Sequence, residues 1–113
     1  MKYFTKLCDF ADEEAPWLND LQLSKIKFVN KKLPLTSGMF FIPTLTVFYE
    51  PDDPSMEFTN IVHELRHVWQ YKTMGKLKYL FMKAFRRKEL EADAWNEEEK
   101  AIYWFLAEEV CGK

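Results

Sequence analysis

The segment between Asp53 and Gly75 constrains the fold most, because its ends and its periodicity both indicate one long helix. Asp53 is a preferred N-cap residue, and Pro54 suits the first helical position, where no backbone N–H is needed. Gly75 is a natural C-cap. At about 100° per residue, one side of the helix carries an apolar stripe, which consists of Phe58, Ile61, Val62, Leu65 and Trp69. Residues 54–74 are therefore predicted to form a helix with one face in the core.

Three short segments before this helix have the composition of strands. Residues 25–33 and 44–49 alternate with a period of two, and residues 38–42 (GMFFI) are rich in strand formers. The spacing also predicts short helices within 3–10 and 17–23 and a last helix over about 87–109, while 77–85 fits either a helix or an apolar loop. We expect one α+β domain, residues 1–113, with a small antiparallel sheet of about three strands packed on helices.

Both histidines of the chain lie on the polar face of the 54–74 helix, in HELRH (63–67). His63 and His67 are one helical turn apart, so their ring nitrogens can bind one metal ion. Glu64 is rotated by about 100° from His63, which leaves its carboxylate free to take a proton from a water molecule on that ion. Because HExxH on a helix is a zinc signature, we expect Zn2+ as cofactor and Glu64 as catalytic base. An ordinary pair of surface histidines is the alternative.

Two histidines do not complete a zinc site, which needs three or four protein ligands. The chain has no third histidine, but the segment RKELEADAW (87–95) offers carboxylates. Glu89 and Asp93 are four residues apart and share a helix face, whereas Glu91 points about 200° away from Glu89. We therefore expect Glu89 as the third ligand, with Asp93 accepting the other ring N–H of a zinc-bound histidine. Glu91 is the alternative ligand.

The order of these motifs resembles a known family. HELRH (63–67) followed by ExxAD (89–93) is similar to the gluzincin-type zinc metallopeptidases, whose third ligand is a glutamate on a downstream helix. Over roughly residues 25–110, the order of strands, HExxH helix and glutamate helix resembles the minimal members called minigluzincins. The resemblance implies a zincin-like fold and zinc-dependent peptide-bond hydrolysis. It assigns His63, His67 and Glu89 as ligands, Glu64 as general base and acid, and Asp93 as support for a histidine.

The resemblance also implies where a peptide substrate binds. In such enzymes the edge strand before the motif helix pairs with the peptide by β-augmentation, and here that strand would lie within residues 44–49. Hydrolysis also needs a donor for the oxyanion of the tetrahedral intermediate. Tyr71, one turn after His67 on the polar face, is the candidate, and Tyr79, Tyr103 and Arg86 are the alternatives.

Composition argues against several other classes of protein. The formal net charge is -2, whereas nucleic-acid-binding domains usually carry a basic excess, so we expect no nucleic-acid partner. A peptide or protein substrate is what the resemblance to gluzincins implies. The basic cluster at 83–88 is followed at once by acids, which favours a structural or helix-dipole role. The chain lacks a secretory signal pattern and a bilayer-spanning apolar run, and Cys8 and Cys111 share no CxxC spacing. These features predict a cytoplasmic protein without a membrane partner.

The C-terminal segment AIYWFLAEEV (101–110) is dense in aromatic residues. Core packing is the default for it, but three consecutive aromatic residues on a helix cannot all point inward. The segment is therefore a candidate contact for a second copy of the chain or for another protein. The alternative function is accordingly a zinc-stabilised binding module, or a latent peptidase, that acts through protein contacts.

Overall fold

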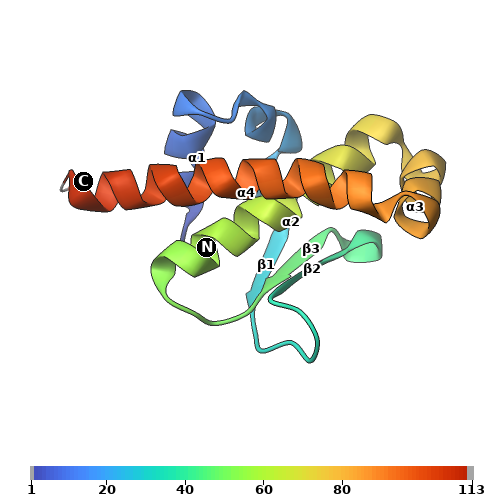
Figure 1. The fold of residues 1–113 in the computed structure, drawn as a ribbon, viewed down its shortest axis with the longest axis horizontal. Helices are drawn as coiled ribbons and strands as arrows, with labels where there is room; N and C mark the ends of the chain where they lie inside the picture. The colour runs from blue at the N-terminus through green and yellow to red at the C-terminus, as the bar shows by residue number, and fades with distance from the viewer. Residues whose placement is uncertain (1, 112–113) are drawn as a thin grey trace.

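The computed structural model describes residues 2–111 and is an α+β structure with helix α2 (Pro54–Met74) at its centre. In Figure 1 the long helix α4 (Arg87–Val110) crosses in front of α2, with α1 above and the three strands below. The remaining elements are α1 (Phe4–Glu13), the 3-10 turns η1 (Pro16–Leu21) and η2 (Leu23–Lys25), β1 (Lys27–Asn30), β2 (Gly38–Phe41), η3 (Ile42–Thr44), β3 (Thr46–Tyr49) and α3 (Lys76–Phe85).

Both predicted ends of α2 are confirmed. Asp53 Oδ1 accepts a hydrogen bond from the Met56 N–H at 3.1 Å, and Pro54 is the first helical residue. Gly75 ends the helix with a φ of 87°, a conformation that glycine adopts without a Cβ clash. After this residue the chain turns directly into α3, so the 77–85 segment is a helix rather than a loop.

The sheet is mixed, not antiparallel as predicted. Its order is β1-β3-β2, with β2 antiparallel to β3 and β1 parallel to β3. The prediction was wrong for the β1–β3 pair because residues 31–37 carry the chain past the position of β3 before β2 begins. As a result β3 is the central strand and β2 is an edge strand, contrary to the expectation that placed the edge within residues 44–49.

The apolar face of α2 packs against α1 and the C-terminal half of α4. Phe58 is fully buried, and its ring centroid lies 5.8 Å from that of Phe10, 5.6 Å from Trp104 and 5.1 Å from Phe105. Burial of each such ring contributes about 1.5–3 kcal/mol to folding. Trp104 and Phe105 therefore belong to the core, whereas the neighbouring Tyr103 is exposed.

A buried carboxylate connects the N-terminus, β1 and α2. Glu57 accepts hydrogen bonds from the Tyr3 hydroxyl at 2.5 Å, the Asn30 amide at 2.9 Å and the Asp52 backbone N–H at 3.1 Å. Burial alone would raise the pKa of Glu57, but these bonds outweigh burial and hold the pKa below its usual value. The ionised carboxylate is thus a structural part of the fold.

Candidate metal centre

The polar face of α2 lies beneath β2 and against α4, and it brings the two histidines together. The Nε2 atoms of His63 and His67 are 3.3 Å apart. Their side chains are only 12% and 9% exposed, respectively. The one-turn spacing read from the sequence therefore places both ring nitrogens at one buried point, as expected for residues four apart on a helix.

Glu91 of α4 completes this group. Its Oε2 lies 3.1 Å from His63 Nε2, and its Oε1 lies 3.1 Å from His67 Nε2. A tetrahedral zinc ion with ligand distances of about 2.0–2.2 Å separates its ligand atoms by about 3.3–3.6 Å. Each histidine nitrogen is thus close to this distance from the other nitrogen and from one oxygen of Glu91. One ligand atom from each of the three residues lies within 4.8 Å of the others, so the group could hold a metal ion.

The structure does not bring Glu89 to the histidines, so Glu91 replaces it in the candidate ligand set. The Glu89 side chain is about half exposed and pairs with Arg86 at 2.7 Å. The rotation of α4 is set by its buried stripe, which consists of Leu90, Ala94, Glu97, Ala101, Trp104 and Phe105. Glu91 flanks this stripe on the side of the histidines. Glu89 and Asp93 do share a helix face, but the packing of the buried stripe determines which residues of α4 lie next to the histidines of α2.

Gln70 fixes the orientation of the His67 ring. Its Nε2 donates to the Leu90 carbonyl oxygen at 2.9 Å and to Asp93 Oδ2 at 2.8 Å. Its Oε1 is therefore the atom that lies 2.8 Å from His67 Nδ1, and this ring nitrogen must be the donor. The Nε2 lone pair of neutral His67 then faces the Glu91 carboxylate, and two acceptors 3.1 Å apart favour a cation between them.

Asp93 supports the centre only indirectly, not through a histidine as expected. Its carboxylate accepts hydrogen bonds from the Gln70 amide and from Nε and Nη2 of Arg66, the latter two at 2.7 Å and 3.0 Å. The carboxylate next to a histidine is instead that of Glu98, whose Oε1 lies 2.8 Å from His63 Nδ1. Sequence reasoning missed Glu98, although it lies two helical turns after Glu91, a spacing that places both on one face.

The surroundings shift the pKa values of the two histidines in opposite directions. Burial lowers the pKa of His67 and so favours the neutral form that binds metal. Burial also acts to lower the pKa of His63, but three neighbouring carboxylates outweigh it and raise this pKa. They belong to Glu98, Glu64 and Glu91. This concentration of negative charge suits a divalent cation.

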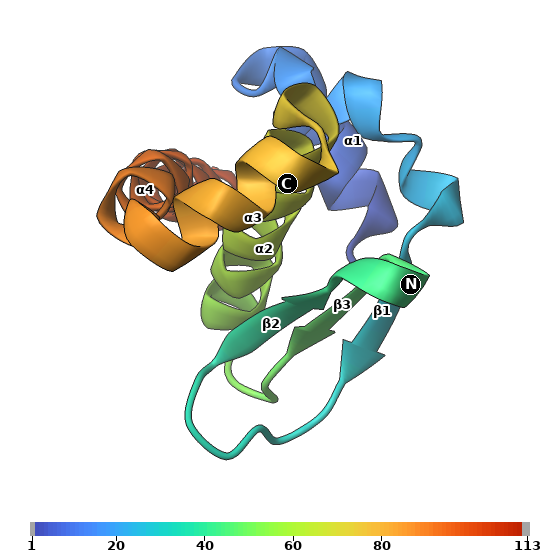
Figure 2. The ribbon, with the colours of Figure 1, turned by 90° about the vertical axis from the view of Figure 1, so that its right-hand side faces the viewer.

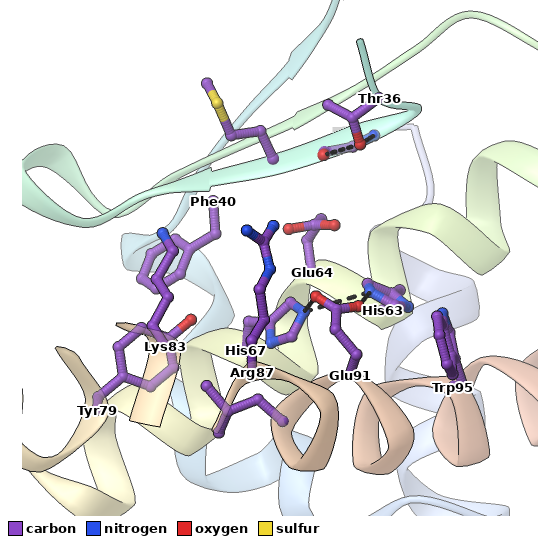
Figure 3. A pocket seen from close by; sticks show the side chains of 13 residues that line it. Thr36, Phe40, His63, Glu64, His67, Tyr79, Lys83, Arg87, Glu91 and Trp95 are labelled. Atoms are coloured by element: carbon purple, nitrogen blue, oxygen red, sulfur yellow. Dashed lines mark hydrogen bonds and ion pairs between the residues drawn. The ribbon is translucent and has the colours of Figure 1, made fainter. Parts of the chain in front are cut away.

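Glu64 lies beside the histidines and directly beneath β2 (Figure 3). It is only 8% exposed, and burial raises its pKa to about 7. A Cβ atom on Gly38 would lie 3.0 Å from Glu64 Oε2 and 3.1 Å from its Cγ, so the missing side chain of Gly38 makes room for the carboxylate. A carboxylate with a pKa near neutrality can both accept and return a proton.

A cavity of about 590 Å³ opens over this group (Figure 3). Strand β2 forms one wall through residues 38–40, and Tyr79, Lys83 and Arg87 contribute to the wall formed by α3 and the start of α4. Cavities of roughly 300–1,000 Å³ are typical of ligand sites. The Glu64 carboxylate and the three candidate ligands all line this cavity and can contact a bound molecule.

Among the candidate oxyanion donors within residues 2–111, Tyr79 lines the cavity and Tyr71 does not. The Tyr71 ring packs against Phe40 and Tyr79, with centroids 6.0 Å and 5.7 Å away. Tyr103 is exposed on the far half of α4, and Arg86 is held in its ion pair. Burial, together with nearby carboxylates, raises the pKa of Tyr79 to about 12, so its hydroxyl keeps its proton at neutral pH.

Comparisons with protein-family models, with curated proteins and with solved structures gave no match. The similarity to gluzincin-type peptidases therefore depends on the two sequence motifs.

Proposed function

We propose that this protein is a zinc-dependent peptidase. The observation that carries the proposal is the grouping of His63, His67 and Glu91 in an open cavity: the two histidine Nε2 atoms lie 3.3 Å apart, and each lies 3.1 Å from one oxygen of the Glu91 carboxylate. Catalytic zinc sites use three protein ligands and a water molecule, whereas structural sites use four protein ligands. The centre offers three protein ligands, and the Glu64 carboxylate lies beside them. The glutamate ligand is in keeping with a gluzincin, although it lies two residues after the position that the resemblance implies.

The roles of the side chains follow from their positions. Zinc, when bound, supplies a Lewis acid that lowers the pKa of a water molecule and polarises a carbonyl group. Glu64, whose carboxylate lines the cavity beside the candidate ligands, accepts the proton of the attacking water and returns it to the leaving amine. The Tyr79 hydroxyl donates a hydrogen bond to the oxygen on which negative charge develops.

The edge of β2 is the proposed binding site for the peptide backbone. Within the described residues β2 pairs with β3 alone, and residues 38–40 border the cavity. An extended peptide added to this edge forms main-chain hydrogen bonds without regard to its side chains. A scissile bond bound in this way lies over Glu64, which sits directly beneath Gly38.

The substitution Glu64→Gln tests the proposal. The zinc-loaded protein and the variant are incubated with a mixture of unstructured peptides, and cleavage is followed by mass spectrometry. The wild type is expected to cleave, and the variant to lose about 10²-fold or more of the rate, since a proton acceptor is removed. Zinc content should be unchanged, because Glu64 is not among the candidate ligands. Glu99→Gln, an exposed change on α4, is the matched control.

A different outcome would favour the alternative function. If the wild type retains stoichiometric zinc but neither it nor Glu64→Gln cleaves any peptide, the centre is a structural part of a binding module. If neither protein retains zinc, both zinc-based functions are wrong.

A further inference from the structure

The outer face of α3 carries an apolar ridge that no other part of the described chain covers. Leu77, Phe81 and Phe85 follow one another at intervals of four residues and are 85%, 56% and 76% exposed. Leu80 lies beside them on the same face and is also exposed. The opposite face of the helix is anchored by Tyr79, which is buried. Exposed apolar side chains that adjoin one another on one helix face mark a site of interaction.

Positive charge accompanies this ridge. Residues 76–88 contain six of the 16 lysines and arginines of the chain and none of its 18 acidic residues, so the other residues hold ten basic against 18 acidic side chains. At about 100° per residue, Lys76 and Lys78 flank the apolar face on its two sides. Among residues 2–111, Arg86 is the one of the six that forms an ion pair. An acidic protein thus presents a local cationic and apolar surface, which is complementary to a negatively charged partner.

We propose that α3 docks on the surface of a lipid bilayer that contains anionic lipids. This differs from the expectation of no membrane partner, which depended on the lack of a bilayer-spanning apolar run. Helices that lie in a membrane interface combine aromatic and leucine side chains on one face with lysines and arginines at its rim. The lysine stems extend along the apolar surface while their charges remain with the lipid headgroups. Three Leu or Phe side chains in line on α3, with a lysine on each side, match this pattern.

The position of α3 in the fold favours a bilayer over a protein groove. Figures 1 and 2 show α3 at one end of the molecule, beyond the ends of the strands, with its outer side turned away from α2 and α4. Because the inner face of α3 packs on the rest of the protein, its outer face can lie on a flat surface while the helix stays packed. Residues 2–111 contain no helix that could span a membrane, so the contact is one of lying on the bilayer and not of crossing it.

The proposed contact is independent of the metal centre. The apolar ridge uses the outer face of α3, whereas Tyr79 and Lys83 on other faces line the cavity. Vesicle binding should therefore be the same in Glu64→Gln as in the wild type, and failure of either proposal leaves the other standing.

Sedimentation with lipid vesicles tests the proposal on the full chain. The protein is expected to pellet with vesicles of phosphatidylglycerol and phosphatidylcholine, weakly with phosphatidylcholine alone, and less as salt is raised. Phe81→Ser should lower the partition coefficient about tenfold or more, because the substitution removes an aromatic ring that would insert into the bilayer. Lys78→Ala should lower it about fivefold. Leu35→Ser and Lys32→Ala, which change exposed residues away from α3, are the matched controls and should bind as the wild type does.

Three results would overturn the proposal. One is the absence of pelleting with anionic vesicles when circular dichroism shows that the protein is folded. Another is pelleting that Phe81→Ser and Lys78→Ala leave unchanged. The third is a wild type that does not bind vesicles and forms a dimer in analytical ultracentrifugation, with Phe81→Ser monomeric. A second copy of the chain would then cover the ridge.

Discussion

The ligand assignment makes a sharp prediction about two glutamates on the same helix. Glu91→Ala removes a carboxylate that lies 3.1 Å from both histidine Nε2 atoms. Glu89→Ala removes a carboxylate of the same chemistry, two residues earlier, that pairs only with exposed Arg86. We expect the first substitution to weaken zinc binding strongly and the second to leave it unchanged.

The size of the effect can be worked out from the number of ligands. Sites with four protein ligands bind zinc with about 10–16 kcal/mol, or roughly 2.5–4 kcal/mol for each ligand, which corresponds to on the order of a hundredfold in Kd. At free zinc of about 1,000 times the wild-type Kd, the ion stabilises the wild type by about 4.1 kcal/mol. A protein with hundredfold weaker binding gains only about 1.4 kcal/mol under the same conditions. For a chain of 113 residues, this difference lowers the zinc-dependent rise in Tm by about 10 °C.

Differential scanning calorimetry measures this quantity directly. Each protein is heated with excess chelator and with zinc, so that its own metal-free Tm is the reference and any change in intrinsic stability cancels. Zinc content after gel filtration gives a second, independent readout. Loss of the zinc-dependent rise in Glu89→Ala but not in Glu91→Ala would refute the argument that the buried stripe of α4 determines its rotation.

Two further predictions concern the surroundings of the centre and the pH dependence of stability. Gly38→Ala adds a Cβ 3.0 Å from Glu64 Oε2 and should lower kcat/KM about 10²-fold, because it displaces the base. Zinc content should be unchanged. Activity equal to that of the wild type would show that β2 does not position Glu64. The depressed pKa of Glu57 contributes stability that is present above its ordinary pKa of 4.5 and is lost as pH falls through the lower, folded-state value. Urea unfolding below pH 4.5 should therefore show a steeper loss of stability in the wild type than in Glu57→Gln, and equal slopes would contradict this.

The sequence predicted those features of the fold that depend on residues close together in the chain. The ends of α2 were predicted correctly because Asp53, Pro54 and Gly75 act on their own helix. The strand positions were also recognisable, since alternation is a property of neighbouring residues. Strand order could not be predicted, because it depends on the path of residues 31–37 in space, and no local sequence pattern specifies that path.

The sequence by itself determined the pair of histidines at one point, with a carboxylate next to them, because residues four apart on a helix are neighbours whatever surrounds the helix. Only the tertiary structure decided which groups complete the centre. The packing of α4 on α2 selected Glu91 over Glu89 and brought Glu98 to His63, and the position of β2 buried Glu64. These choices depend on contacts between residues as far apart in the sequence as His63 and Glu98, and the relative rotation of their helices is fixed only when the apolar faces meet.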